Sequence, residues 1–169
     1  MSSYNNQTTR RTLILSLAAM GTLGACGFQP AYGPNGPAAN LRGSVEVDAP
    51  DTQNGFNLVR RLEERLGQPQ AAQYALSYTL TLSEDALGIT PAQETTRYNV
   101  LGAINYAVRN VGTGAVVHSG TVDNFTSYSA TGTTVSTLTA QRSAHARLMI
   151  VLADQITNRL IATSGGWAQ

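Results

Sequence analysis

The sequence YALSYTLTL at residues 74–82, followed by RYNVLGAINYAVRN at residues 97–110, decides the fold. In both stretches large apolar residues alternate with polar or small ones. Successive side chains of a strand point to opposite faces of a sheet, so a period of two indicates strands with one buried face and one polar face. We expect a loop from Glu84 to Thr96 between these two strands.

Two further strands are expected around this pair. The sequence NVGTG at residues 110–114 is typical of a hairpin turn, so a fourth strand over residues 115–125 would run antiparallel to its predecessor. Valines alternate with polar residues at 43–48, which indicates a short first strand. The polar run at 126–134 is expected to end the sheet.

A first helix is predicted to end at Leu66, because Gly67 can adopt the left-handed conformation that closes a helix. Asp51 or Asn54 can cap its start. The expected buried stripe consists of Phe56, Val59, Leu62 and Leu66, with Leu58 beside them. The charged residues between positions 60 and 65 would then form a solvated face, with Arg60 and Glu64 at the spacing of a helical ion pair.

A long second helix is predicted from about Val135 to Ile161. Its apolar residues recur every four positions, at Leu148, Leu152, Ile156 and Leu160. Arg159 would lie in the last turn, where a positive charge suits the helix dipole. The order is therefore β-α-β-β-β-α. Two amphipathic helices need one apolar sheet face, which predicts an α+β two-layer sandwich: a four-stranded mixed sheet covered on one face by both helices.

The N-terminus has the pattern of an export signal over residues 1–25. The basic pair Arg10-Arg11 precedes an apolar stretch, residues 12–23, that is too short to span a bilayer. Leu23-Gly24-Ala25-Cys26 resembles the lipobox of bacterial lipoproteins, which implies that Cys26 is lipidated. The alternative is that Cys26 is a buried thiol beside a core helix. The export route stays open between an ordinary and a twin-arginine signal.

Residues 26–42 are rich in Gly and Pro and are expected to be a lipidated tether, leaving residues 43–169 as a single domain. Without its first 25 residues the chain has nine arginines, no lysine and ten acidic residues. Binding of nucleic acid needs a basic face, and this balance does not provide one. The only cysteine is Cys26, and no His, Asp or Glu cluster has ligand spacing, so neither a structural metal site nor a cofactor is expected.

The residues that could carry catalysis do not form a catalytic arrangement in the sequence. His118 and Ser119 would face opposite sides of the fourth strand, which also carries Asp123. His145 is expected on the surface of the last helix, near the core stripe. We therefore expect a protein that is not an enzyme.

Three segments resemble one lipoprotein family. The opening CGFQPAYG at 26–33, the helix GFNLVRRLEERL at 55–66 and the ending LADQITNRL at 152–160 are similar to segments of the LptE lipopolysaccharide-assembly family. Ala31 stands where that family usually has a larger apolar residue. The resemblance implies a lipid-anchored protein on the periplasmic side of the outer membrane. It also implies that the chain plugs the β-barrel protein LptD in a one-to-one heterodimer, helps its assembly, and binds lipopolysaccharide during delivery to the cell surface.

Arg97 and Arg109 are the candidate lipopolysaccharide contacts, because arginine forks bind phosphate. Arg97 is preferred, since the apolar residues between positions 87 and 91 precede it. The alternative for these arginines is a surface ion pair, with Glu94, Glu46 or Asp123. The alternative function is an auxiliary or pilot lipoprotein of another envelope lipid-transport or secretion system.

Overall fold

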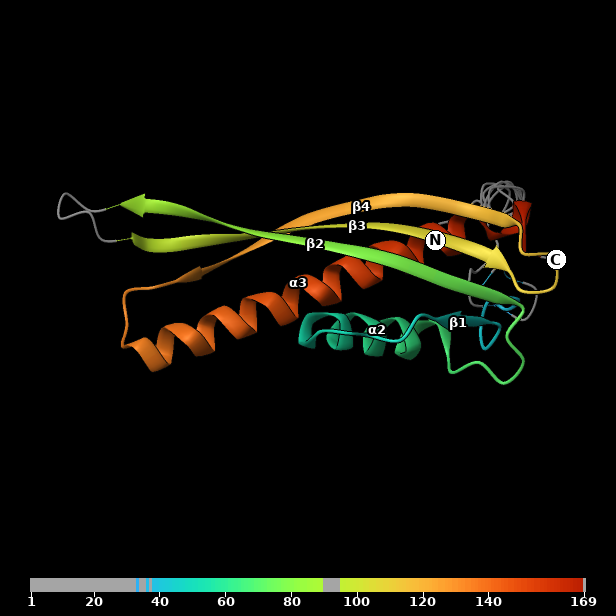
Figure 1. Cartoon of the computed structure of the whole chain (residues 1–169), viewed down its shortest axis with the longest axis horizontal. Helices are drawn as coiled ribbons and strands as arrows, with labels where there is room; N and C mark the ends of the chain where they lie inside the picture. Colours follow the sequence, from blue (N-terminus) through green and yellow to red (C-terminus); the bar gives the residue numbers. More distant parts are fainter. Residues whose placement is uncertain (1–32, 34–35, 37, 90–94, 169) are drawn as a thin grey trace, which may run out of the picture.

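The computed structural model describes residues 33, 36, 38–89 and 95–168, and Cys26 and the predicted signal lie outside this range. Its elements are β1 (Val45–Val47), α2 (Gln53–Leu66), β2 (Tyr74–Ile89), β3 (Thr95–Asn110), β4 (Val116–Ser129), α3 (Thr134–Thr163) and a final 3-10 turn (Ser164–Gly166). The predicted β-α-β-β-β-α order is confirmed. Figure 1 shows an elongated molecule in which the hairpin of β2 and β3 extends well beyond α2.

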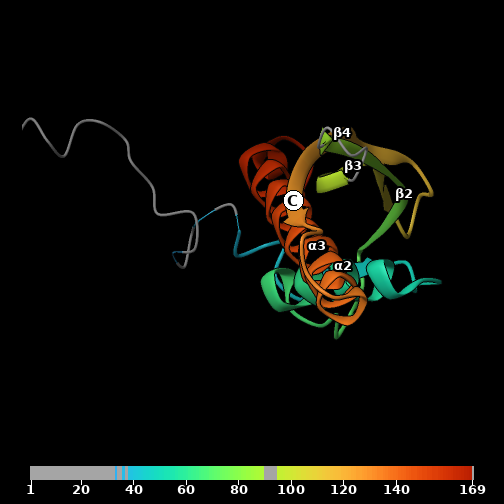
Figure 2. The same ribbon diagram turned by 90° about the vertical axis from the view of Figure 1, so that its left-hand side faces the viewer.

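The four strands lie in the order β1-β2-β3-β4, with β1 parallel to β2 and the other neighbours antiparallel. Both helices lie on the same face of this twisted sheet (Figures 1 and 2). The predicted fold class, a mixed sheet covered on one face, is therefore confirmed. The register of β2 on β3 runs without a shift from the Tyr74–Asn110 pair to the Ile89–Thr95 pair.

The core lies between the sheet and α3, and α2 covers its lower side. Every leucine and isoleucine of the predicted stripe in α3 is fully buried. At Gly102, α3 comes so close to the sheet that an added Cβ would lie 3.0 Å from both Leu148 and Leu152. A glycine is thus what permits the helix to rest on the middle of β3.

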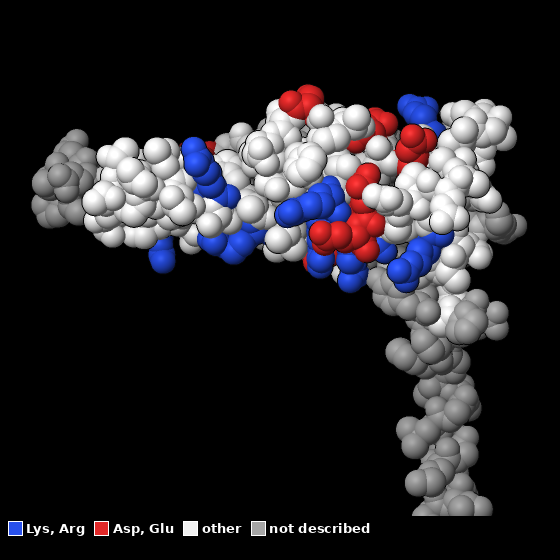
Figure 3. Space-filling model, turned by 90° about the horizontal axis from the view of Figure 1, so that it is seen from below, with Lys and Arg blue, Asp and Glu red and all other residues white. Residues whose placement is uncertain are grey.

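Charge is unevenly distributed along the molecule. On the face in Figure 3, acidic side chains gather over the broad end, whereas the narrow end shows mainly arginine. We call the narrow end the arm, and define it as residues 83–89, 95–101, 125–129 and 134–147. The arm consists of the outer parts of the three long strands and the first half of α3.

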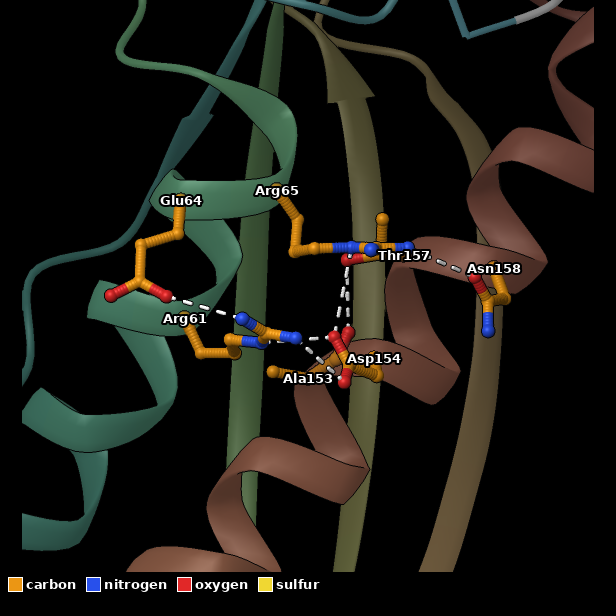
Figure 4. A network of polar contacts seen from close by, with 7 residues as sticks. All are labelled: Arg61, Glu64, Arg65, Ala153, Asp154, Thr157 and Asn158. Atoms are coloured by element: carbon orange, nitrogen blue, oxygen red, sulfur yellow. Dashed lines mark hydrogen bonds and ion pairs between the residues drawn. The ribbon is translucent and has the colours of Figure 1, made fainter. Parts of the chain in front are cut away.

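The two helices are joined by an ion-pair network (Figure 4). Arg61 of α2 donates two hydrogen bonds to the carboxylate of Asp154 in α3, each 3.0 Å long. Glu64 accepts a third bond from Arg61, and Arg65 lies 3.6 Å from Asp154. The prediction of a solvated charged face on α2 was therefore wrong for Arg61 and Arg65, and Glu64 pairs with Arg61 rather than Arg60.

Several helix details differ from the prediction. The side chain of Thr52 caps α2 by accepting from the Gly55 N–H at 3.0 Å, so neither Asp51 nor Asn54 is the cap. Phe56 is 55% exposed, whereas Leu58 lies in the core, because two residues along a helix rotate the side chain by about 200°. The predicted closing role of Gly67, with φ of 79°, is confirmed.

Helix α3 is longer than predicted and continues to Thr163. Arg159 therefore lies before its last turn, and donates to the backbone carbonyl of Thr121 in β4 instead of serving the helix end. Trp167, which follows the final 3-10 turn, then covers the end of the core near the start of β2. Trp167 stacks on His118 and meets Tyr74 edge-on at a centroid distance of 5.1 Å.

The strands also extend further than predicted. Residues 84–89 belong to β2, where a loop was expected. Residues 126–129 belong to β4, although the polar run that begins at residue 126 was expected to end the sheet. Before β1, Leu41 is 1% exposed and Ala38 is 5% exposed, so the packed domain already includes the last residues of the expected tether.

Candidate functional site on the arm and the open sheet edge

Arg97 lies on the arm, on the face of the sheet away from the helices. Its strand neighbours are Leu87 of β2 and Ser129 of β4. Arg97 is exposed, and Leu87 is 44% exposed beside it. An apolar group and a guanidinium are therefore adjacent, as predicted, although strand pairing and not a loop brings them together.

Arg109 lies on the same face of β3 but at its other end. Twelve residues separate the two arginines, which corresponds to roughly 40 Å along a strand. One lipid headgroup cannot touch both. Within the described residues neither arginine forms an ion pair, so the predicted pairs with Glu46 and Asp123 are not formed, and Glu94 lies outside that range.

A polar cluster on the inner side of the arm was missed by sequence reasoning. Glu84 of β2 points toward α3, where Gln141 and His145 donate to its Oε1 at 2.8 and 2.7 Å. Tyr128 of β4 donates to Oε2 at 2.9 Å, and Asn54 of α2 lies 3.3 Å from the other ring nitrogen of His145. The cluster thereby ties all four elements together at the base of the arm.

The electrostatics of this cluster favour an ionised Glu84. Burial alone would raise its pKa, but the hydrogen bonds from Gln141, His145 and Tyr128 outweigh that effect and lower the pKa of the carboxyl below 4.5. Burial, reinforced by the bond to Glu84, raises the pKa of the Tyr128 hydroxyl to about 12. His145 is thus a cross-element partner and not only a helix-surface residue. A neutral ring protonated at Nε2 satisfies both of its contacts.

Two hollows flank Asn54. An open groove of about 780 Å³ lies between the start of α2 and α3. Its lining is rich in amides and includes Arg142 and His145. A second cleft of about 500 Å³ lies between β2 and the segment before α2.

The second cleft combines an apolar wall with an acidic one. Its β2 side consists of Tyr78, Leu80 and Leu82, and Asp48 and Asp51 lie on the opposite side. Burial raises the pKa of the Tyr78 hydroxyl, and the nearby charges of Asp51 and Asp48 raise it further. The cleft therefore has a negative potential beside an apolar strand surface.

The backbone groups at the two edges of the sheet have different partners. At β4, Arg147 and Arg159 of α3 donate to the backbone carbonyls of Ser127 and Thr121. Twelve helical residues and six strand residues span similar lengths, roughly 18 and 20 Å, so one helix can serve both carbonyls. At the other edge, β1 covers β2 only as far as Leu76.

The residues considered for catalysis do not converge. His118 of β4 lies opposite Val108 of β3 on the inner face of the sheet, 3.3 Å from the Tyr106 hydroxyl. Ser119 and Asp123 lie on the outer face. The described residues contain no group of three or more His, Cys, Asp or Glu that could hold a metal ion. They also include no helix that is long and apolar enough to cross a membrane.

The fold and the site define a class of small α+β proteins with an elongated mixed sheet and two helices on one face. A protein from Caulobacter crescentus CB15 described as a lipoprotein shares it with a TM-score of 0.66 and 20% identity, over 79% of this chain and 99% of that one. Rare lipoprotein B from Shewanella oneidensis matches with a TM-score of 0.56 and 16% identity, over 72% and 95%. A minor lipoprotein from Acinetobacter baumannii matches with a TM-score of 0.53 and 20% identity, over 73% and 92%.

These likenesses concern the fold, and the family follows from the sequence. The model of the LptE family, described as lipopolysaccharide-assembly, matches residues 43–160. The chain belongs to the LptE family, as its three motifs predicted. Among curated proteins none matches the chain.

Proposed function

We propose that this chain is an outer-membrane lipoprotein, anchored through Cys26, that occupies the lumen of the β-barrel protein LptD. There it helps the barrel to assemble and binds lipopolysaccharide for delivery to the cell surface. The observation that carries this proposal is the family match over residues 43–160. The anchor fits this role, because a triacylated cysteine holds a protein at a membrane far more firmly than one acyl chain does.

The outward face of the sheet supports placement inside a barrel. Outward positions over residues 77–83, 99–107 and 119–127 carry one charged residue, Asp123. On the same face Phe125 is 62% exposed next to Leu101, which is 37% exposed. A face with few charges and a large exposed aromatic side chain is typical of a surface that a partner covers.

The arm supports lipopolysaccharide contact. Arg97 presents a guanidinium that no described carboxylate neutralises, beside the exposed side chain of Leu87. Lipopolysaccharide carries phosphates next to acyl chains, so a basic group beside an apolar one matches its chemistry. Arg109 lies outside the arm, at the other end of β3, and we assign it no lipid contact.

Co-purification tests the proposal. Tagged full-length chain, extracted from membranes in mild detergent, should bring down one large outer-membrane barrel at a one-to-one ratio. A Cys26→Ala chain should leave the membrane fraction when the barrel is absent. Recovery of inner-membrane ATPase subunits in place of the barrel would overturn the proposal in favour of another envelope system.

A further inference from the structure

The open edge of β2 has free backbone groups whose direction can be derived. On the β1 side, Tyr74 donates from its N–H to the Ser44 carbonyl at 3.0 Å, and Leu76 accepts from the Asp48 N–H at 2.9 Å. The backbone groups of a strand alternate in direction, residue by residue. Those of Tyr78, Leu80 and Leu82 therefore point away from β3, into the open edge.

Nothing in the described part of the chain pairs with these groups. The last backbone contact to this edge is the one at Leu76, and the β1–β2 ladder ends there. Natural proteins usually protect such edges with charges, prolines or bulges. Residues 77–83 contain no charge, no proline and no bulge.

The opposite edge shows what protection looks like in this molecule. Arg147 and Arg159 of α3 donate to two β4 carbonyls that point away from β3, and α3 runs beside that strand. Two carbonyls of one edge are thus bonded by side chains of the fold itself, whereas an uncharged stretch of the other edge has no partner among the described residues. This asymmetry indicates that a partner, and not solvent, satisfies the β2 edge.

We propose that an extended segment of the barrel partner adds to this edge as a fifth strand of the sheet; this inference rests on the proposed function. The segment would exchange backbone hydrogen bonds with Tyr78, Leu80 and Leu82. Its inward side chains would enter the cleft of about 500 Å³ and cover the half-buried Leu80 and Leu82. Asp48 and Asp51 on the opposite wall call for a basic residue in that segment.

A second copy of the chain fits this edge less well. If two β2 edges paired antiparallel about Leu80, Glu84 of one copy would lie opposite Leu76 of the other. Asp48, bonded at Leu76, would then lie beside Glu84 of its neighbour. Two acidic residues would be brought close together on each side of the pairing, and like charges in close opposition are destabilising.

Amide hydrogen exchange at single-residue resolution tests the proposal on the full chain, free and in its co-purified complex. In the free chain the amides of Tyr78, Leu80 and Leu82 should exchange rapidly, whereas those of Thr79, Thr81 and Ser83, which point toward β3, should be protected. In the complex all six should be protected, with the first three slowed at least tenfold. If the barrel co-purifies but these three amides stay fast, the fifth strand is refuted and the proposed function stands.

Failure of the barrel to co-purify would instead overturn the proposed function and this inference together. Protection of the three amides in the isolated chain, with the mass of a dimer, would identify a second copy as the occupant and also refute the proposal.

A variant pair gives a second readout. Leu82→Pro removes an N–H that points into the open edge and so costs no bond to β3, whereas Leu82→Ala removes only the side chain. Leu82→Pro should recover roughly tenfold less barrel than Leu82→Ala, since it lacks one bond and the proline ring obstructs the added strand. Equal recovery by the two variants would contradict the fifth strand.

Discussion

Arg61 and Asp154 form a two-pronged ion pair between α2 and α3, with both nitrogen–oxygen distances at 3.0 Å. The two residues are 93 positions apart in the chain and belong to the two helical segments that resemble the LptE family, GFNLVRRLEERL and LADQITNRL. Their pairing gives these motifs a structural role: they hold the two helices in register on the sheet. The side chains are 30% and 32% exposed, so the pair is partly shielded from solvent.

The first prediction concerns this pair. Asp154→Ala should lower the melting temperature, because it leaves Arg61 and Arg65 without their shared carboxylate. Arg61→Lys should also have a melting temperature below that of the wild type, since an ammonium group cannot donate to the carboxylate in the bidentate manner. Arg60→Ala, an exposed change on the same helix, is the matched control. Equal melting temperatures for Asp154→Ala and Arg60→Ala would show that the pair does not hold the helices.

Glu84 gives the second prediction. Glu84→Ala leaves Tyr128, Gln141 and His145 without their common acceptor and should cost about 1 kcal/mol of unfolding free energy, because the cluster is only partly buried. Asp85→Ala, at the exposed neighbouring position, should cost little.

The effect should depend on pH in a defined direction. The folded pKa of Glu84 is lowered, so the unfolded chain binds the proton first as pH falls. The stabilisation is present above pH 4.5 and is lost as pH falls through the lower folded value. Urea unfolding of wild type and Glu84→Ala should therefore converge in acid. A constant difference down to full protonation would contradict an ionised Glu84.

The third prediction concerns the contact of α3 with β3. A Cβ at Gly102 would lie 3.0 Å from the ends of Leu148 and Leu152 and 3.2 Å from Leu82. Gly102→Val should destabilise the protein by about 1–3 kcal/mol through overpacking. Gly165→Val, at a position with no atom within 4 Å of the added Cβ, is the control. Equal unfolding free energies for the two variants would place α3 further from the sheet.

The fourth prediction separates the two candidate arginines. Arg97→Glu should weaken lipopolysaccharide binding by roughly tenfold to a hundredfold, the range expected for losing a charge-assisted hydrogen bond. Arg109→Glu makes the same charge change at the far end of the same strand and should bind as wild type does. Binding of purified protein to immobilised lipopolysaccharide measures both. Wild-type binding by Arg97→Glu would remove Arg97 as a contact.

The sequence was sufficient for the order of elements, because periods of two and near four are local properties of the chain. The alternation over residues 74–82 and 98–108 predicted the central strands, and the leucine series predicted the buried face of α3. Gly67 ended α2 as expected, since its left-handed conformation is a single-residue property.

What the sequence did not reveal depends on partners that are distant in the chain. Glu84 seemed to break the strand pattern, and its inward position makes sense only with Tyr128, Gln141 and His145 around it. The prediction therefore ended this strand at Leu82, seven residues before β2 ends at Ile89. The pair of Arg61 and Asp154 was hidden for the same reason, because helix spacing gives only partners within one helix.

The open edge of β2 could not be inferred from sequence at all. It depends on where β1 ends and on which strand α3 accompanies, and both are properties of the assembled sheet. Arg97 was found from its residue type and apolar neighbours, but its distance from Arg109 needed the register of β3.

The most direct test of the central claim is the amount of newly made lipopolysaccharide that reaches the cell surface after this protein is depleted from the cells that make it. Our account predicts that surface lipopolysaccharide and the level of assembled barrel both fall, and that the wild-type chain restores them. Unchanged surface lipopolysaccharide and unchanged barrel after full depletion would contradict a role in lipopolysaccharide assembly.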